Sequence, residues 1–194
     1  MDFLNSEYWN NRYKASDTPW DIGAPSTPLI EFAKTIENKA LHILIPGAGK
    51  AHEAVFLHEA GFENVLVCDW AETSFDFLKQ EAPDFPRQNM LVCDFFEMNL
   101  KVDLILEQTF FCAIDPAQRR RYAQKSFELL NSGGRLAGVL FASHFEKPGP
   151  PFGGGAAEYR RIFEEFFIIQ KLEPAYNSIA PRAGNELFIE LLKA

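Results

Sequence analysis

Short apolar runs alternate with longer stretches of helical spacing between Leu41 and Ala142, and this alternation constrains the fold more than any other feature. The runs, rich in Leu, Ile and Val, cover residues 41–45, 64–69, 90–94, 102–107 and 135–142. Strand and helix in alternation predict βαβ units, and therefore a parallel sheet with helices on both faces. We expect a Rossmann-like, doubly wound α/β fold.

The pattern changes at both ends of the chain. After a loop rich in Pro and Gly at 147–155, a helix is expected at 157–166, followed by strands at 167–172 and 186–192. The short connection between these two strands favours an antiparallel last strand, completing a mostly parallel sheet of seven. Helices expected at 6–14 and 28–37 form an N-terminal cover. We therefore expect residues 1–194 to form a single domain, with residues 1–38 covering its ligand site.

Composition excludes several classes of protein. The 27 acidic and 19 basic residues give a net charge of -8, which argues against a nucleic-acid partner. The three cysteines have no CxxC spacing and no metal-ligand spacing to the histidines, so reduced thiols and no metal are expected. No apolar run approaches the roughly 18 residues of a membrane helix, and no signal peptide is evident. These observations predict a cytoplasmic protein, monomeric, acting on a small molecule without a membrane partner.

Candidate site residues follow the predicted strands. Ligands of open α/β sheets bind outside the carboxyl ends of the strands. Gly47 and Gly49 follow the first strand, and Asp69, Asp94 and Glu107 end the next three. Any one of these carboxylates could instead cap a helix, but the set favours a binding site at this edge of the sheet.

The Gly47-Ala48-Gly49 turn lacks the features that hold a pyrophosphate. The dinucleotide fingerprint requires a third glycine where His52 stands, and a phosphate-binding loop requires residues that Leu44 and Ala51 do not supply. The remaining interpretation is a turn that brings the backbone close to a ligand that has no phosphate tail. Asp69 can accept hydrogen bonds from both hydroxyls of a ribose, and Asp94-Phe95 can bind an adenine. S-adenosylmethionine has this shape.

Six stretches in order resemble the thiopurine S-methyltransferase superfamily of class I methyltransferases, which also contains the halide/thiol methyltransferases. The first-strand stretch Leu44–Glu53 resembles the family's first motif, and the likeness extends over nearly the whole chain. The other stretches are Tyr8–Tyr13, Thr18–Gly23, Thr109–Ile114, Gly149–Phe152 and Ser178–Gly184.

The resemblance implies a cofactor, S-adenosyl-L-methionine, and a set of residues that hold it. The implied cofactor-binding residues are Trp9, Tyr13, Trp20, Gly47, Gly49, Asp69, Trp70, Asp94, Phe95, Glu107 and Gln108. Two departures from the family pattern stand out. A tryptophan is more usual at Tyr13, and the halide/thiol branch tends to have Asp-Tyr at Glu107-Gln108. Arg119 matches an arginine that lies beside the substrate in the thiopurine branch, so we expect it to position the acceptor.

The expected activity is methyl transfer to a small soft nucleophile: a thiol or thiolate, a thiopurine-like compound or a halide. Such nucleophiles require alignment and desolvation more than a base, and Cys112 has no convincing base partner. The expected substrate pocket comprises Ile22, Phe110, Phe111 and Phe152. The chain has 19 phenylalanines, and those in strand-end loops predict a dry aromatic pocket. The alternatives are an O- or N-methyltransferase with the same cofactor, or a protein that binds the cofactor without turnover.

Overall fold

The computed structural model describes residues 4–146 and 149–194, and its centre is a seven-stranded sheet with the strand order β3-β2-β1-β4-β5-β7-β6. Strands β1 to β5 are parallel, whereas β7 is antiparallel to both β5 and β6. The strands are β1 (His42–Pro46), β2 (Asn64–Asp69), β3 (Met90–Val92), β4 (Val102–Gln108), β5 (Leu130–Phe141), β6 (Ile168–Pro174) and β7 (Glu186–Leu192). The predicted doubly wound sheet with an antiparallel last strand is confirmed.

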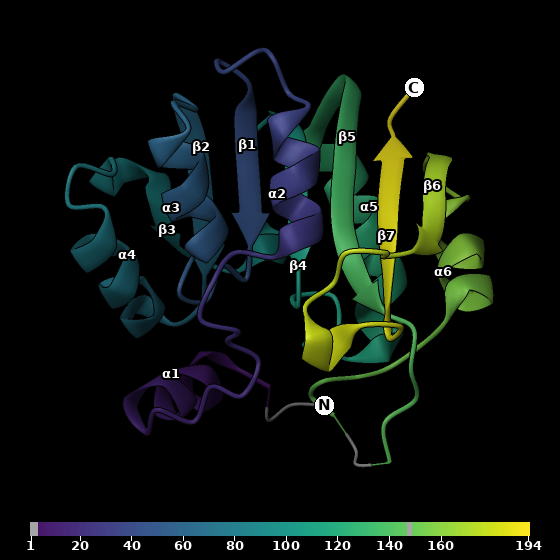
Figure 1. Ribbon diagram of the computed structural model, residues 1–194, viewed down its shortest axis with the longest axis horizontal. Helices are drawn as coiled ribbons and strands as arrows, with labels where there is room; N and C mark the ends of the chain where they lie inside the picture. The colour runs from purple at the N-terminus through teal and green to yellow at the C-terminus, as the bar shows by residue number, and fades with distance from the viewer. Residues whose placement is uncertain (1–3, 147–148) are drawn as a thin grey trace.

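Helices cover both faces of the sheet (Figure 1). One face packs against α2 (Thr27–Lys34), α3 (His52–Glu59) and α4 (Asp76–Glu81), and the other against α5 (Arg119–Leu129) and α6 (Ala156–Phe163). Helix α1 (Ser6–Lys14) lies apart from both layers, near the carboxyl ends of the parallel strands (Figure 1). This position makes the N-terminal segment a cover over the edge where ligands of such sheets bind.

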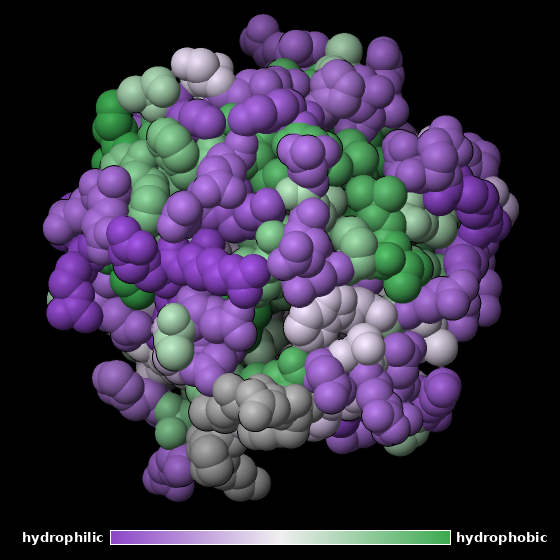
Figure 2. Space-filling view, turned by 180° about the vertical axis from the view of Figure 1, so that it is seen from behind, coloured by the Kyte–Doolittle hydropathy of each residue, from purple (hydrophilic) through white to green (hydrophobic). Residues whose placement is uncertain are grey.

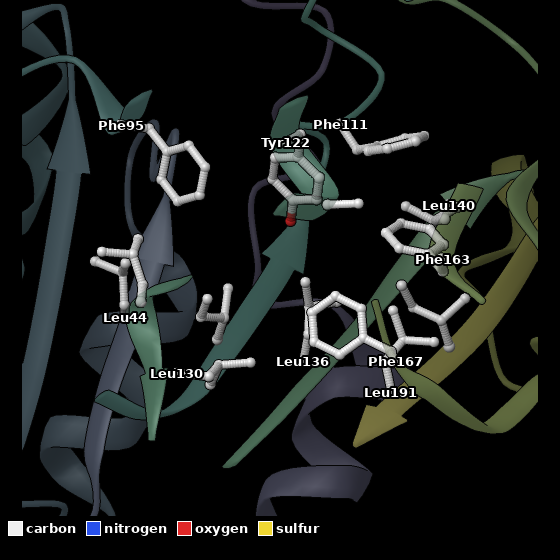
Figure 3. Close-up of a cluster of buried hydrophobic side chains, with 14 of the residues drawn as sticks. Leu44, Phe95, Phe111, Tyr122, Leu130, Leu136, Leu140, Phe163, Phe167 and Leu191 are labelled. Atoms are coloured by element: carbon white, nitrogen blue, oxygen red, sulfur yellow. The ribbon is translucent and has the colours of Figure 1, made fainter. Parts of the chain in front are cut away.

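Each face of the sheet has its own apolar core. Leu29 and Phe32 of α2 pack on one face, and Tyr122 and Phe163 of α5 and α6 pack on the other. Complete burial of one large apolar side chain stabilises a fold by about 1.5–3 kcal/mol. Figure 3 shows the second core, where aromatic and leucine side chains fill the space between β4, β5 and the helices.

Strand β5 begins earlier than the sequence predicts. The apolar run that predicts this strand starts at residue 135, but Leu130 already pairs with Val102, and the register shifts before Leu104 pairs with Arg135. A Cβ at Gly134 would lie 3.1 Å from the carbonyl oxygen of Asp103. The glycine therefore permits close approach of two strands here, rather than ending the element.

Other departures are smaller. The helical segment between β2 and β3 consists of a 3-10 turn, η1 (Glu72–Phe75), and α4. Of the Pro/Gly-rich loop predicted at 147–155, residues 147–148 lie outside the described residues. No helix in the described part of the chain is long and apolar enough to cross a membrane. Figure 2 shows hydrophilic side chains interspersed with apolar ones over the face behind the view of Figure 1.

Candidate active site

A cavity of about 430 Å³ opens at the carboxyl ends of the central strands, beside α1. Residues from the N-terminal cover, from three strand ends and from the loop after β4 line it. The expected site residues in its wall are Trp9, Tyr13, Trp20, Gly47, Asp69, Trp70, Asp94, Phe95 and Phe110. Residues that are far apart in the sequence thus meet at one site.

A second cavity of about 30 Å³ adjoins the first, and both are bordered by Trp20, Gly47 and Thr109. Three expected site residues border only the smaller space: Ile22, Gly49 and Gln108. Within the described ranges, four further expected residues line neither cavity: Glu107, Phe111, Arg119 and Phe152.

The glycine turn after β1 brings backbone to the cavity wall. Gly47 and Gly49 have φ values of 57° and 56°, which a glycine adopts without the cost that a Cβ imposes. A Cβ at Gly47 would lie 2.4 Å from the ring of Phe110. The glycine therefore permits the close approach of the Phe110 ring to the turn.

The Asp69 carboxylate joins this turn to the end of β2. Its Oδ2 accepts a hydrogen bond from the Gly49 amide at 3.1 Å, and its Oδ1 accepts one from the Ala71 amide at 2.9 Å. Burial raises the pKa of Asp69 to about 6, although the amides of Ala71, Gly49 and Trp70 oppose the shift. Each carboxylate oxygen retains a lone pair for a donor in the cavity.

Asp94 and Phe95 shape the wall at the end of β3. Asp94 Oδ1 accepts from the Phe96 amide at 2.8 Å and so caps the 3-10 turn η3 (Phe95–Glu97). The ring of Phe95 is almost fully buried and stacks on Tyr122 with centroids 5.4 Å apart, as the facing rings in Figure 3 show. Phe95 therefore borders the cavity while packing in the core.

Three aromatic residues of the N-terminal cover pack edge to face. The centroid of Trp20 lies 5.4 Å from that of Trp9 and 5.7 Å from that of Tyr13. Tyr13 stands where the family more usually has tryptophan, and its hydroxyl lies 3.2 Å from the position that a Cβ of Gly49 would occupy. Burial, and then the charge of Asp69, raise the pKa of Tyr13, so its phenol stays neutral.

Ion pairs fix this cover to the glycine turn. Asp21 contacts Lys50 Nζ at 2.7 Å and His52 Nε2 at 2.8 Å. Burial acts to raise the pKa of Asp21, but hydrogen bonds from Lys50, Gly23 and His52 outweigh it and lower the pKa to about 2. At neutral pH the carboxylate is therefore ionised and holds the cover against the sheet.

The Glu107 carboxylate points into the core instead of the cavity. Its Oε2 accepts from the Tyr122 hydroxyl at 2.6 Å, and its Oε1 accepts from the Phe111 amide at 2.8 Å. Burial raises the pKa of Glu107 to about 7, against the effect of these hydrogen bonds. The structure thus places Glu107 below the loop 109–114, which it anchors, and not at the expected cofactor-binding position.

Arg119, the expected acceptor-positioning residue, is also enclosed. Its side chain is 2% exposed and its Nη1 contacts Glu158 Oε1 at 2.7 Å. Its Nη2 donates to the carbonyl oxygens of Phe152 and Gly153 at 3.2 and 2.9 Å. Pro150 and Pro151 of the same loop line the cavity, whereas Arg119 does not. Arg119 therefore affects the cavity only indirectly, by holding this loop in place.

Arg182 is one of two basic residues, with Arg12, that line the main cavity within the described part of the chain and that sequence reasoning did not include among the site residues. It lies in the 3-10 turn η5 (Ala180–Arg182) before β7 and lines the main cavity. Its Nη2 donates to the Trp20 carbonyl oxygen at 2.8 Å, and its Nη1 contacts Glu186 Oε1 at 3.2 Å. The only sequence signal was its place as a lone basic residue in a stretch that resembles the family.

The loop phenylalanines divide between wall and core. Phe95, Phe96, Phe110 and Phe141 line the cavity, whereas Phe111 packs in the core on Tyr159 and Phe163. Cys112 also borders the cavity, with its thiol donating to the Thr109 carbonyl oxygen at 3.1 Å. Burial raises the pKa of Cys112 to about 12, so its thiol is not a nucleophile at neutral pH.

Comparisons with known proteins agree with this geometry. The family model described as thiopurine S-methyltransferase matches residues 4–189. The chain is 31% identical to a protein of Arabidopsis thaliana named probable thiol methyltransferase 2, over 96% of this chain and 84% of that protein. It is 27% identical to a thiopurine S-methyltransferase of Vibrio cholerae, over 81% of this chain and 80% of that protein.

The fold has counterparts among solved methyltransferases. A 1,6-didemethyltoxoflavin-N1-methyltransferase of Burkholderia thailandensis, solved with 1,6-didemethyltoxoflavin and S-adenosylhomocysteine, superposes with a TM-score of 0.75. The identity is 16%, and the alignment covers 97% of this chain and 87% of that one. At this identity the likeness concerns the fold alone.

Proposed function

The chain belongs to the thiopurine S-methyltransferase family and is an S-adenosylmethionine-dependent methyltransferase, and from this premise we propose that its acceptor is a small, soft, anionic nucleophile. A thiolate is the principal candidate, with thiopurine-like compounds and halides in the same class. The observation that carries the proposal is the guanidinium of Arg182, which lines the cavity beside the aromatic ring of Phe141.

The residues at the strand ends suit the cofactor. Asp69 would accept hydrogen bonds from the ribose hydroxyls, because each of its oxygens keeps a lone pair in addition to the one that accepts from a backbone amide. Asp94 and Phe95 would hold the adenine, and the chain beyond the ribose would pass along the part of the wall that Gly47 lines. Trp9, Tyr13 and Trp20 would exclude water. When bound, S-adenosylmethionine supplies a methyl group on a sulfonium, which is transferred by in-line displacement.

The acceptor end supports an anion. A guanidinium carries five N–H donors, and the hydrogen bonds of Arg182 to Trp20 and Glu186 use only part of that capacity. The Arg182 guanidinium also lies 5.4 Å from the ring centroid of Phe141. A polarisable anion would thus meet a positive group and an apolar surface together, which favours a thiolate over a strongly hydrated oxyanion.

The titratable groups in the wall support the same choice. Oxygen and nitrogen acceptors usually need a positioned base. The phenol of Tyr13 and the thiol of Cys112 both stay protonated at neutral pH. Three carboxylates also line the cavity: Asp69 and Asp94, which the proposal assigns to the cofactor, and Asp115, whose Oδ1 accepts from the Ala117 amide at 2.9 Å. We infer that the residues of this chain act by orienting the acceptor and removing its water, with no proton transfer.

Three further expectations are part of the proposal. Residues 1–194 would act as a single domain in which residues 1–38 close the site. The free cysteines support a reducing, cytoplasmic compartment. The third expectation is that the protein acts as a monomer.

Kinetics of Arg182 variants test the acceptor assignment. Loss of one charged hydrogen bond costs roughly 1.5–3 kcal/mol, so Arg182→Ala should lower kcat/KM for a carboxylated aromatic thiol about 10- to 150-fold. Arg182→Lys should restore part of the loss. The affinity for S-adenosylmethionine, measured by calorimetry, should change little.

Two controls guard this result. Because Arg182 also holds the Trp20 carbonyl, the unfolding free energy of each variant must be measured in parallel. Arg135→Ala, at a partly exposed pair with Glu190 outside the cavity, provides a matched loss of one arginine. Equal losses of kcat/KM for anionic and uncharged acceptors in Arg182→Ala would contradict the proposed role.

A further inference from the structure

Two cysteines that the proposed reaction does not use lie side by side in the cavity wall. Cys68 is in β2 and Cys93 directly follows β3, the neighbouring parallel strand. The Cys93 amide donates to the carbonyl oxygen of Asp69 at 3.1 Å, so the strand ends stay paired beyond the last ladder residue. Both cysteines line the main cavity and pack in the same apolar cluster.

The two thiols lie on neighbouring strand ends and differ in exposure. Cys68 is 1% exposed, whereas Cys93 is half-buried. The neighbouring Cys68 thiol lowers the pKa of the Cys93 thiol, against burial and the charge of Asp94. The Cys93 thiol, together with burial, raises the pKa of Cys68. The Cys93 thiol is thus suited to react first, and the Cys68 thiol to react with Cys93 afterwards.

The third cysteine provides an internal contrast. Cys112 borders the same cavity, but its thiol donates to a backbone carbonyl oxygen instead of another sulfur. Reactivity of a cysteine requires the thiolate, and burial keeps Cys112 protonated. Two features, a neighbouring thiol and access from the cavity, therefore separate Cys93 from Cys112.

We propose that Cys68 and Cys93 form a reactive dithiol site in the cavity wall, which reacts with low-molecular-weight disulfides and closes to an intramolecular disulfide. The Cys93 thiolate attacks one sulfur of the small disulfide, whose S–S bond breaks and releases one thiolate. Cys68, losing its proton, then attacks the Cys93 sulfur of the mixed disulfide and releases the second small thiol. The protein dithiol is oxidised by two electrons, and the small disulfide is reduced to two thiols.

The site lies beside the groups assigned to the cofactor. Asp69 and Asp94 directly follow Cys68 and Cys93, and this part of the inference rests on the proposed function. A nucleoside held by these carboxylates would cover the thiols, and a closed disulfide would fix the strand ends that carry them. Cofactor binding and oxidation should therefore compete.

Peptide mapping tests the site directly, because trypsin separates the three cysteines. Cleavage at Lys50, Lys79, Arg87, Lys101 and Arg119 gives peptides 51–79, 88–101 and 102–119, with one cysteine each. The purified protein is treated with oxidised glutathione, alkylated, digested and analysed by mass spectrometry without reduction. The expected product is peptide 51–79 linked to peptide 88–101, with Cys112 alkylated.

Single variants identify the attacking sulfur. Cys93→Ser should slow the loss of the Cys68 thiol at least about tenfold, whereas Cys68→Ser should accumulate a stable glutathione adduct on Cys93. Cys112→Ser should form the crosslink as the unchanged protein does. A persistent glutathione adduct on Cys93 in the unchanged protein, a link to Cys112, or equal oxidation of all three cysteines would overturn the proposal.

A protection experiment separates this inference from the proposed function. S-adenosylhomocysteine at saturating concentration should slow crosslinking at least about fivefold, by occluding thiols whose access limits their rate. A crosslink that forms at the same rate with bound S-adenosylhomocysteine would support the dithiol site and contradict the placement of the nucleoside beside it. Mass spectrometry reports these outcomes whether or not any acceptor is methylated.

Discussion

Two regions of the molecule each contain a carboxylate and an arginine, but they use these charges differently. At the corner between β4 and α5, Glu107 and Arg119 are enclosed and bonded to protein groups. In the cavity wall, Asp69 and Arg182 bond to protein groups and also face the cavity.

The difference lies in the partners available to each charge. Arg119 meets a carboxylate and two carbonyl oxygens, so its guanidinium holds a loop in place. Arg182 meets one carboxylate and one carbonyl oxygen, and it lines the cavity, which Arg119 does not. Residue type and position after a strand are thus insufficient to identify a ligand-binding charge. The number of internal partners decides between the two roles.

The largest effect is expected from Arg119→Ala. Glu158 is 34% exposed, so most of the expected loss comes from the two carbonyl oxygens, at about 1–3 kcal/mol for each polar group left unsatisfied. Here Glu158 and the carbonyl oxygens of Phe152 and Gly153 would lose their donor. Urea denaturation measures the loss.

The adjacent arginine is the matched control. Arg120 pairs with Glu165 at 2.7 Å, but both side chains are exposed. Arg120→Ala should change the unfolding free energy by less than about 1 kcal/mol. If Arg119→Ala were as stable as Arg120→Ala but had lost turnover with anionic acceptors, Arg119 would belong to the cavity region after all.

The next effect concerns Glu107, whose pKa is raised by burial to about 7. The folded protein then holds a proton that the unfolded chain releases above its ordinary pKa near 4.5. The unfolding free energy therefore falls by up to about 3 kcal/mol as the pH rises from about 4.5 to 7. Above pH 7 this contribution no longer changes. Glu107→Gln keeps the shape and should abolish this slope.

The comparison is made on the difference in unfolding free energy between variant and unchanged protein across pH 4.5–8. Glu107→Gln should gain relative stability as pH rises, whereas Glu165→Gln at the exposed pair should not. A flat difference for Glu107→Gln would mean that its carboxylate is ionised in the fold over the whole range.

The smallest effect concerns Asp69 in the cavity wall. Its pKa of about 6 means that the carboxylate becomes protonated below that pH and accepts hydrogen bonds from hydroxyl groups less well. Cofactor affinity, measured by calorimetry, should fall about tenfold per pH unit below 6. Asp69→Asn should bind weakly with little pH dependence. A pH-independent affinity in the unchanged protein would remove Asp69 from the cofactor site.

Local pattern was enough to predict the groups at the strand ends. In a parallel sheet the carboxyl ends of β1, β2 and β3 share one edge, so the apolar runs alone bring Gly47, Asp69 and Asp94 together. The same reasoning misplaced Glu107. Its side chain turns inward because Tyr122, 15 residues later, and the Phe111 amide supply donors there.

Loop residues were harder to predict, because their positions depend on contacts across the whole chain. Arg182 reaches the cavity by bonding to the carbonyl of Trp20, 162 residues earlier. Phe110 and Phe111 are adjacent in an apolar run, yet one lines the cavity and the other packs on Tyr159 and Phe163. Composition predicted an aromatic pocket but could not assign individual rings to it.

The central claim is that this cavity serves a soft anionic acceptor without a base. Initial rates of methyl transfer to thiophenol and phenol, at saturating S-adenosylmethionine and pH 8, test it most directly because the two acceptors differ in one atom. We predict that thiophenol is methylated on sulfur at least about a hundredfold faster, since phenol would need the proton transfer that the wall does not supply. Equal or faster methylation of phenol, or cofactor binding with no transfer to thiophenol, bisulfide or iodide, would contradict the account.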